Sequence, residues 1–170
     1  MLLPPENLSD DQIEVWQQAL EYFHRALAHQ KTGDLGSALR DYRSSLALFP
    51  TPEAHTFLAW CYARIHLFEQ ALAECHKAIA LDPDYGNPYN DIGAYLIDEG
   101  RLREAIPWLE KAKQAKRYAT PAYPTFNLGR IHEKRGRWTQ ALAAYEEALA
   151  LHPAYREARQ ARDRILGRLS

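Results

Sequence analysis

One spacing of about 34 residues recurs along this sequence and constrains its fold more than any other feature. Ala38, Ala71, Ala105 and Ala141 follow one another at intervals of 33, 34 and 36 residues. Three further columns, each of one equivalent position per copy, keep the same intervals: Ala26, Ala59, Gly93 and Gly129; Tyr42, Cys75, Leu109 and Tyr145; Ser45, Ala78, Ala112 and Ala148. In a repeat architecture each copy buries its apolar face only against its neighbours. The sequence therefore predicts four copies of one small unit, stacked together.

Each copy has the pattern of two helices separated by a short break. Gly33, Gly100 and Gly136 stand at the break in three copies, and glycine readily takes the left-handed conformation that ends a helix. His66 occupies the break in the second copy, so that turn is expected to be strained or differently closed. Ala and Leu dominate, Val occurs once, and charges recur three and four residues apart, which favours helices over strands. The predicted fold class is all-α, with about four helix-turn-helix repeats.

The small residues of the repeat have a packing role. Two helices joined by a short turn pack antiparallel, and small side chains at the crossing let their axes approach. Ala71 and Ala105 are therefore expected to face Ala59 and Gly93 of the preceding helices.

These columns carry a resemblance to a known family. The matching residues are Tyr22, Ala26, Gly33, Ala38 and Tyr42 in copy one; Leu58, Ala59, Tyr62, Ala71, Ala78 and Pro83 in copy two; Ile92, Gly93, Gly100, Ala105 and Ala112 in copy three; and Leu128, Gly129, Ala141, Tyr145, Ala148 and Pro153 in copy four. Over about residues 19–155 the chain resembles the tetratricopeptide repeat family. The resemblance implies a right-handed α-solenoid whose concave groove binds a peptide or partner segment.

The resemblance divides the chain into parts. An N-terminal arm and helix extension is expected over 1–18, repeats over 19–51, 52–85, 86–121 and 122–153, and a C-terminal capping helix over 154–170.

Both ends of the array have features of their own. Ser9 and Gln12 form a capping-box pattern, which starts the first helix at about residue 10 and makes it longer than the other first helices. Its apolar stripe, with Trp16 at the centre, is interpreted as a cover for the open end of the array or as a self-association or partner surface. The arginine-rich final helix is interpreted as a solvated cap or as a basic docking site.

Several function classes are not expected. The chain has 21 Lys and Arg against 22 Asp and Glu, a net charge of −1, which argues against binding nucleic acid through an excess of positive charge. No stretch has the apolar length of a membrane span, and the N-terminus does not have the pattern of a secretory signal, so a cytoplasmic location is expected. Cys61 and Cys75 form no metal-ligand motif, and no catalytic or nucleotide-binding motif occurs. We expect no enzyme activity, no metal and no cofactor.

The first helix of each repeat is expected to line the concave groove. The candidate binding residues there are aromatic, amide-bearing or charged: Phe57, Trp60, Arg64, Asn90, Asp91, Phe126, Asn127 and Arg130. Aromatic rings would anchor apolar side chains, amides would bind a peptide main chain, and charges would set its orientation. Family members that bind chaperone C-termini clamp the peptide carboxylate with lysine, asparagine and arginine. The positions of this chain that correspond to the clamp carry no cations, so that ligand is not expected.

Alternatives to this interpretation remain open. Phe57 and Trp60 also fit a role in core packing. The leading hypothesis is a non-catalytic adaptor that binds a protein or peptide ligand. The alternative is a self-assembling scaffold or structural subunit, in which the chain forms a homo-oligomer.

Overall fold

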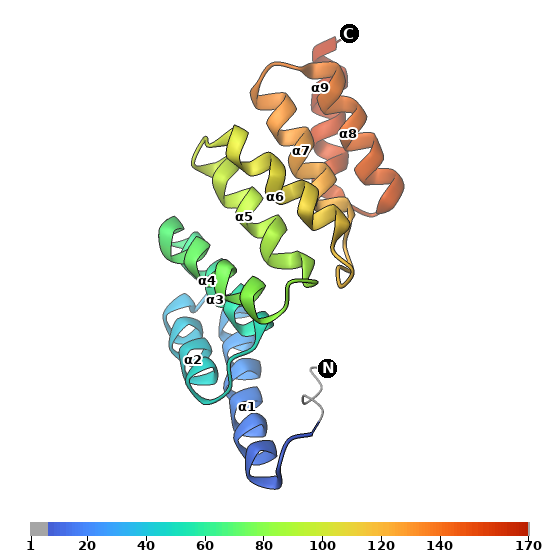
Figure 1. Cartoon of the computed structure of the whole chain (residues 1–170). Coiled ribbons are helices and arrows are strands. Elements are labelled where there is room, and N and C mark those ends of the chain that lie inside the picture. Colours follow the sequence, from blue (N-terminus) through green and yellow to red (C-terminus); the bar gives the residue numbers. More distant parts are fainter. Residues whose placement is uncertain (1–6, 170) are drawn as a thin grey trace. The chain divides into compact units, whose positions relative to one another are not determined.

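The computed structural model describes residues 7–169 (Figure 1), so the first six residues of the predicted N-terminal arm, and Ser170, lie outside the described residues. In the described range the regular elements are α-helices, and the predicted all-α class is confirmed. The helices are α1 (Asp10–Thr32), α2 (Leu35–Leu48), α3 (Pro52–Arg64), α4 (Phe68–Leu81), α5 (Gly86–Asp98), α6 (Leu102–Gln114), α7 (Ala122–Lys134), α8 (Trp138–Leu151) and α9 (Arg156–Leu169).

The first helix begins with the predicted capping box. The Ser9 hydroxyl accepts a hydrogen bond from the Gln12 backbone N–H at 3.3 Å, and the Gln12 side chain accepts one from the Ser9 N–H at 3.0 Å. Both bonds satisfy N–H groups that an uncapped helix would leave without partners. At 23 residues, α1 is nine residues longer than the 14-residue α2 beside it.

The turns inside the helix pairs use the left-handed conformation that the sequence predicts. Gly33, Gly100 and Gly136 have φ values of 82°, 79° and 69°. His66 takes the same conformation with φ 61°. A side chain with a Cβ rarely adopts this region, so the expected strain at the second turn is confirmed.

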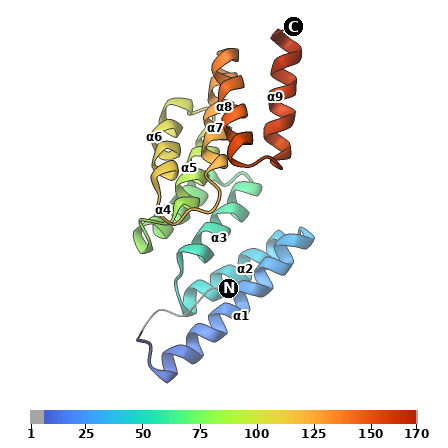
Figure 2. The ribbon, with the colours of Figure 1, turned by 90° about the vertical axis from the view of Figure 1, so that its right-hand side faces the viewer.

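The chain forms two compact units, each of which is described by itself: residues 1–82 and residues 83–170. In the first unit, α1 packs against α2, α2 against α3, and α3 against α4. In the second, α5 packs against α6 and α7, α6 against α7, and α8 against both α7 and α9. Figure 2 shows α7, α8 and α9 lying side by side.

The small residues of the repeat columns lie at the helix crossings, where they are fully buried. The structure differs from the predicted pairing of Gly93 with Ala105. A Cβ placed on Gly93 would first meet the side chain of Leu109, one helical turn beyond Ala105. On Gly129 it would lie 2.6 Å from a ring carbon of Tyr145. The glycines of α5 and α7 therefore make room for a large side chain of the second helix.

A buried tyrosine of the second helix reaches back to the first helix in both units. Tyr42 donates a hydrogen bond to Gln30 Oε1 at 2.7 Å, and Tyr145 donates one to Glu133 Oε2 at 2.6 Å. Both pairs are separated by 12 residues in the chain. Copies one and four therefore share a hydrogen bond as well as a sequence pattern.

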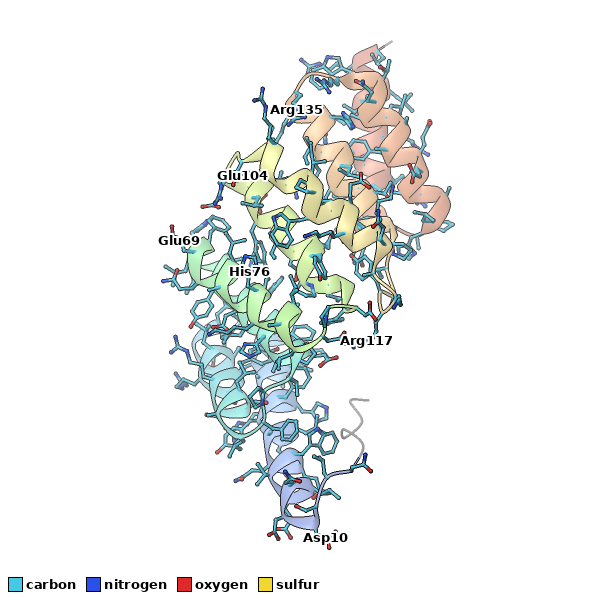
Figure 3. All side chains as sticks on the ribbon, in the orientation of Figure 1. Asp10, Glu69, His76, Glu104, Arg117 and Arg135 are labelled. Carbon is cyan, nitrogen blue, oxygen red and sulfur yellow. The ribbon has the colours of Figure 1, made fainter. Side chains whose placement is uncertain are left out.

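The basic segment after α6 is held against the start of α5. The Gly86 N–H donates to the Arg117 carbonyl at 3.1 Å, and the Arg117 N–H donates to the Asp84 carbonyl at 2.9 Å. The Arg117 guanidinium lies 4.1 Å from the centre of the Tyr85 ring. Figure 3 labels Arg117 beside this junction. These contacts give the basic residue at this position a structural role.

Candidate functional site

The predicted groove residues fall in both units. Phe57, Trp60 and Arg64 lie on α3 in the first unit; Asn90 and Asp91 on α5, and Phe126, Asn127 and Arg130 on α7, lie in the second.

In the first unit, Phe57 packs with the aromatic side chains of α1 and α2. Its ring centre lies 5.6 Å from that of Phe23, edge on, and 6.0 Å from that of Tyr42, stacked. Such pairs stabilise a core beyond the area they bury. One turn after Phe57, Trp60 is half-buried, and the Arg64 guanidinium lies 5.7 Å from its ring centre. The exposed part of the site in this unit is thus an indole with a cation over it.

In the second unit, the polar predicted residues form a hydrogen-bonded ladder between α5 and α7. The Asn127 Nδ2 donates to Asn90 Oδ1 at 2.9 Å, and Asn90 Nδ2 donates to Asp91 Oδ1 at 3.3 Å. Arg130 donates to Asn127 Oδ1 at 3.0 Å and to Asp98 Oδ1 at 2.6 Å. Asn90 and Asn127 are buried. The two amides therefore hydrogen-bond to each other. Much of the capacity of Asn90 and Asn127 to bind a peptide main chain is already used inside the ladder.

The carboxyl group at one end of this ladder has an altered pKa. Burial raises the pKa of Asp91 to about 7, although the hydrogen bond from Asn90 favours the ionised form. A carboxyl group whose pKa is this high exchanges its proton close to neutral pH.

Next to the ladder, α7, α8 and α9 enclose a hollow of about 570 Å³. We name it the α7–α9 pocket. Two predicted residues line it, Phe126 and Arg130. Its other lining residues are Glu133, Lys134, Trp138, Tyr145, Glu157, Gln160, Ala161, Arg164 and Arg168. Aromatic rings from α7 and α8 thus meet cationic side chains from α7 and α9.

The aromatic side chains of the pocket are fixed by their contacts. The Phe126 ring lies 5.4 Å from the Tyr145 ring and 5.0 Å from the Tyr155 ring, centre to centre. Arg168 lies over the Trp138 ring at 4.4 Å. These contacts fix the pocket's shape before any ligand arrives, which reduces the entropy lost on binding.

A hydrogen-bonded triad centres on Glu133. Arg164 donates to both Glu133 carboxylate oxygens, at 3.0 and 2.8 Å, and Tyr145 donates to one of them at 2.6 Å. Burial alone would raise the pKa of Glu133, but these bonds outweigh it and lower the pKa. Burial and the carboxylate together raise the pKa of Tyr145, so its hydroxyl remains a donor. The triad joins α7, α8 and α9.

Sequence reasoning missed the contribution of α9 to this pocket, although a signal for it is present. Glu157, Ala161, Arg164 and Arg168 recur at i, i+4, i+7 and i+11, which places them on one face of a helix. The sequence alone did not show that this face turns toward α7.

The described residues offer no centre for metal or thiol chemistry. Within 7–169, no three His, Cys, Asp or Glu side chains are grouped as a metal site requires. Cys61 and Cys75 are buried and form no disulfide, and burial raises the pKa of Cys61 to about 11. That thiol is therefore protonated at neutral pH, whereas a nucleophilic cysteine needs the thiolate. Across the same residues, no helix combines the length and the apolar character of a membrane span.

Comparison with known proteins agrees with the repeat pattern. Two family models match, both described as tetratricopeptide repeat, one over residues 23–86 and one over residues 84–154. A curated relative, the chloroplastic tetratricopeptide repeat domain-containing protein PYG7 of Arabidopsis thaliana, is 33% identical over 90 residues, which cover 52% of this chain and 29% of that protein. The chain spans less than a third of the length of the curated relatives it matches.

Solved structures show the same fold. A structure of Pseudomonas aeruginosa pilF is similar with a TM-score of 0.80 and 23% identity, and the match covers 94% of this chain and 71% of that one. The second TPR of Spaghetti (RPAP3), bound to the HSP90 peptide SRMEEVD, is similar with a TM-score of 0.59 and 25% identity, and the match covers 64% of this chain and all of that one.

Proposed function

Because the chain belongs to the tetratricopeptide repeat family, whose fold is a protein–protein interaction module, we propose that it is a non-catalytic adaptor that binds a peptide or partner segment. The binding residues in this proposal are those predicted from the sequence: Phe57, Trp60, Arg64, Asn90, Asp91, Phe126, Asn127 and Arg130. The α7–α9 pocket is the part of the site with the clearest geometry.

One observation carries the proposal: Phe126 and Arg130, chosen from the sequence, line a preformed hollow of about 570 Å³ with an aromatic floor and a charged rim. Fixed aromatic rings bind apolar side chains with little loss of conformational freedom. Charged groups at a rim set orientation and discriminate among partners. This combination suits a protein segment that carries an apolar anchor next to charged residues.

The peptide-bound Spaghetti structure supports the proposal at the level of ligand class only. It shows a peptide on a similar helical array. The identity of that peptide is not transferred, because the positions that correspond to the family's carboxylate clamp carry no cations. A cytoplasmic location and the absence of catalysis stay predictions from the sequence.

The test fills the pocket without removing any of its contacts. Gln160 is exposed and lines the pocket, so Gln160→Trp places an indole in the space that a ligand would use. The matched control is Gln140→Trp, the same substitution at an exposed position of α8 outside the pocket. Immobilised wild type and both variants are used to capture proteins from a native extract, and the captured proteins are identified by mass spectrometry.

The expected result is a set of proteins that wild type and Gln140→Trp retain and Gln160→Trp loses. Circular dichroism should show the same helicity for all three chains. If Gln160→Trp captures the same proteins as wild type, the α7–α9 pocket is not the binding site.

The predicted residues of the first unit have a test of their own. Trp60→Ala removes the half-buried indole and its cation–π contact with Arg64 at 5.7 Å, which is worth about 0.5–1 kcal/mol near the surface. Capture of the same proteins should weaken while the thermal melting temperature changes little. Unchanged capture would remove Trp60 from the site.

A further inference from the structure

The charges of this nearly neutral chain are divided unequally between its two units. Residues 1–82 contain six Lys and Arg against eleven Asp and Glu, a net charge of −5. Residues 83–170 contain fifteen against eleven, a net charge of +4. A molecule with opposite charges on its two parts attracts another copy in a head-to-tail orientation.

The negative charge of the first unit includes a stripe on the long helix α1. Asp10, Glu14 and Glu21 recur at i, i+4 and i+11, so they share one helical face. They are exposed, whereas Trp16 and Ala19, on the opposite face, are buried. We name these three residues the acidic stripe. Figure 3 shows Asp10 at the outer end of α1.

The carboxylates of the acidic stripe make no ion pair within the described residues. Asp10 and Glu14 are like charges one turn apart, an arrangement that costs a helix a few tenths of a kcal/mol. The first turns of α1 also extend beyond α2: the nine-residue difference in length corresponds to about 13 Å of helix. The stripe is therefore accessible and uncompensated by the chain's own cations.

The α7–α9 pocket has the complementary charge. Four cations line it, against two carboxylates: Arg130, Lys134, Arg164 and Arg168, with Glu133 and Glu157. Arg164 is paired with Glu133, and Arg130 with Asp98. Lys134 is exposed and has no ion pair among the described residues. The pocket thus offers an excess of positive charge beside an aromatic floor.

We propose that two copies of this chain associate head to tail, with the acidic stripe of one copy seated against the α7–α9 pocket of the other. Val15, which is 39% exposed and follows Glu14, supplies an apolar side chain at the edge of the contact. The inference rests on the proposed function, because it uses the same pocket and names a second copy of the chain as its occupant.

This contact joins two different surfaces, so it is heterologous. In each pair, the copy that supplies the stripe keeps a free pocket, and the copy that supplies the pocket keeps a free stripe. Such a contact adds further copies until it closes into a ring, and otherwise builds an open chain. Association should therefore increase with concentration beyond the dimer.

Sedimentation velocity on the full chain, over a range of concentrations, measures this association. Raising the ionic strength from about 0.1 M to about 1 M shortens the Debye length from about 10 Å to about 3 Å, so association should weaken at least tenfold. A chain that sediments as a monomer at every concentration at low ionic strength would overturn the proposal.

Single charge reversals locate the two surfaces. Glu14→Lys reverses a charge of the stripe, and Lys134→Glu reverses one of the pocket; each should weaken association about tenfold. The controls reverse the same charges in the same units at exposed positions outside both surfaces, Glu69→Lys on α4 (Figure 3) and Arg103→Glu on α6. The controls should associate like wild type. Equal weakening by controls and test variants would show a general charge effect and overturn the proposal.

Mixing the two test variants provides the decisive measurement. Each variant alone lacks one of the two surfaces, but Lys134→Glu retains the native stripe and Glu14→Lys retains the native pocket. An equimolar mixture should therefore form a complex that neither variant forms alone. A mixture that stays as dissociated as its components would refute the head-to-tail contact. Circular dichroism of each variant confirms that it is folded.

The outcome separates this inference from the proposed function. A strictly monomeric wild type with a Gln160→Trp variant that loses its captured proteins would overturn self-association and leave the adaptor in place. A Gln160→Trp variant that still captures the same proteins and still associates would overturn both.

Discussion

Replacing Asn127 by alanine tests whether the polar ladder of α5 and α7 is structural. Asn127 is buried; its amide donates to Asn90 at 2.9 Å and accepts from Arg130 at 3.0 Å. In Asn127→Ala the buried Asn90 Oδ1 loses that donor. Arg130 keeps Asp98 at 2.6 Å, so the loss at Asn90 dominates. An unsatisfied buried acceptor costs about 1–3 kcal/mol, and the free energy of unfolding should fall by that amount.

Two measurements give this quantity. Urea denaturation gives the stability of the chain, and native-state hydrogen exchange of α5 and α7 gives the local opening free energy, since helical arrays unfold in parts. Asn87→Ala is the matched control: it is the same change on α5, at a half-buried side chain with no hydrogen bond among the described residues. It should change the stability by less than about 0.5 kcal/mol.

A double-mutant cycle isolates the amide–amide bond. If Asn90 and Asn127 support each other, the double alanine variant should be less destabilised than the sum of the single variants, with a coupling of about 0.5–3 kcal/mol. If Asn127→Ala instead unfolds like wild type and loses only partner capture, the ladder has no structural role and Asn127 is a ligand-binding amide. That result would refute the structural reasoning.

Four further substitutions should have the following effects. Gly129→Ala should lower the free energy of unfolding, measured by urea denaturation, by about 1–2 kcal/mol, because the new Cβ would lie 2.6 Å from Tyr145. Gly167→Ala places its Cβ in open space and should raise the free energy of unfolding by about 0.5–1 kcal/mol. Burial raises the pKa of Asp91 from its ordinary value of 3.8 to about 7. The stability that this neutral carboxyl group contributes is therefore fully present below pH 3.8 and is lost as the pH rises through 7. Asp91→Asn should remove that loss in denaturation curves at successive pH values. Burial would raise the pKa of Glu74, but hydrogen bonds from the His55 and Lys77 side chains lower it below 4.5. The stability that the ionised Glu74 contributes is therefore present above pH 4.5 and lost on acidification. Glu74→Gln should flatten the acid limb of the same curves, and an unchanged acid limb would contradict this role.

Much of the fold was predictable because the repeat determines local structure and packing together. The glycines at three of the four breaks, the capping box at Ser9 and the alternation of helices all follow from short-range rules. At His66 the pattern predicts a turn that is strained or differently closed, and the φ of 61° shows the strained left-handed conformation. The residue that packs against Gly93 was harder to predict, because equivalent positions of a repeat locate a helix crossing only to within one helical turn.

The site was less predictable, because a residue type does not reveal whether its hydrogen bonds are already used. Asn90 and Asn127 were selected for their capacity to bind a peptide main chain, and in the structure they bind each other. The arginines of α9 were interpreted as a solvated cap or a docking surface, and Arg164 binds Glu133 on α7. Pairing between residues more than thirty positions apart depends on how helices turn about their axes, which one sequence does not specify.

The distinction between engaged and unengaged polar groups also indicates which residues would contact a ligand first. In the α7–α9 pocket, Arg130, Arg164 and Tyr145 hold internal hydrogen bonds, and breaking these on binding would offset the gain from new ones. Among the described residues, Lys134 and Gln160 line the same pocket with no hydrogen bond or ion pair. A ligand gains most from groups that lose only water, so these two side chains should govern affinity, while the engaged groups keep the pocket's shape. Substitutions at Lys134 should therefore change partner binding without changing stability, and substitutions at Arg164 should change both.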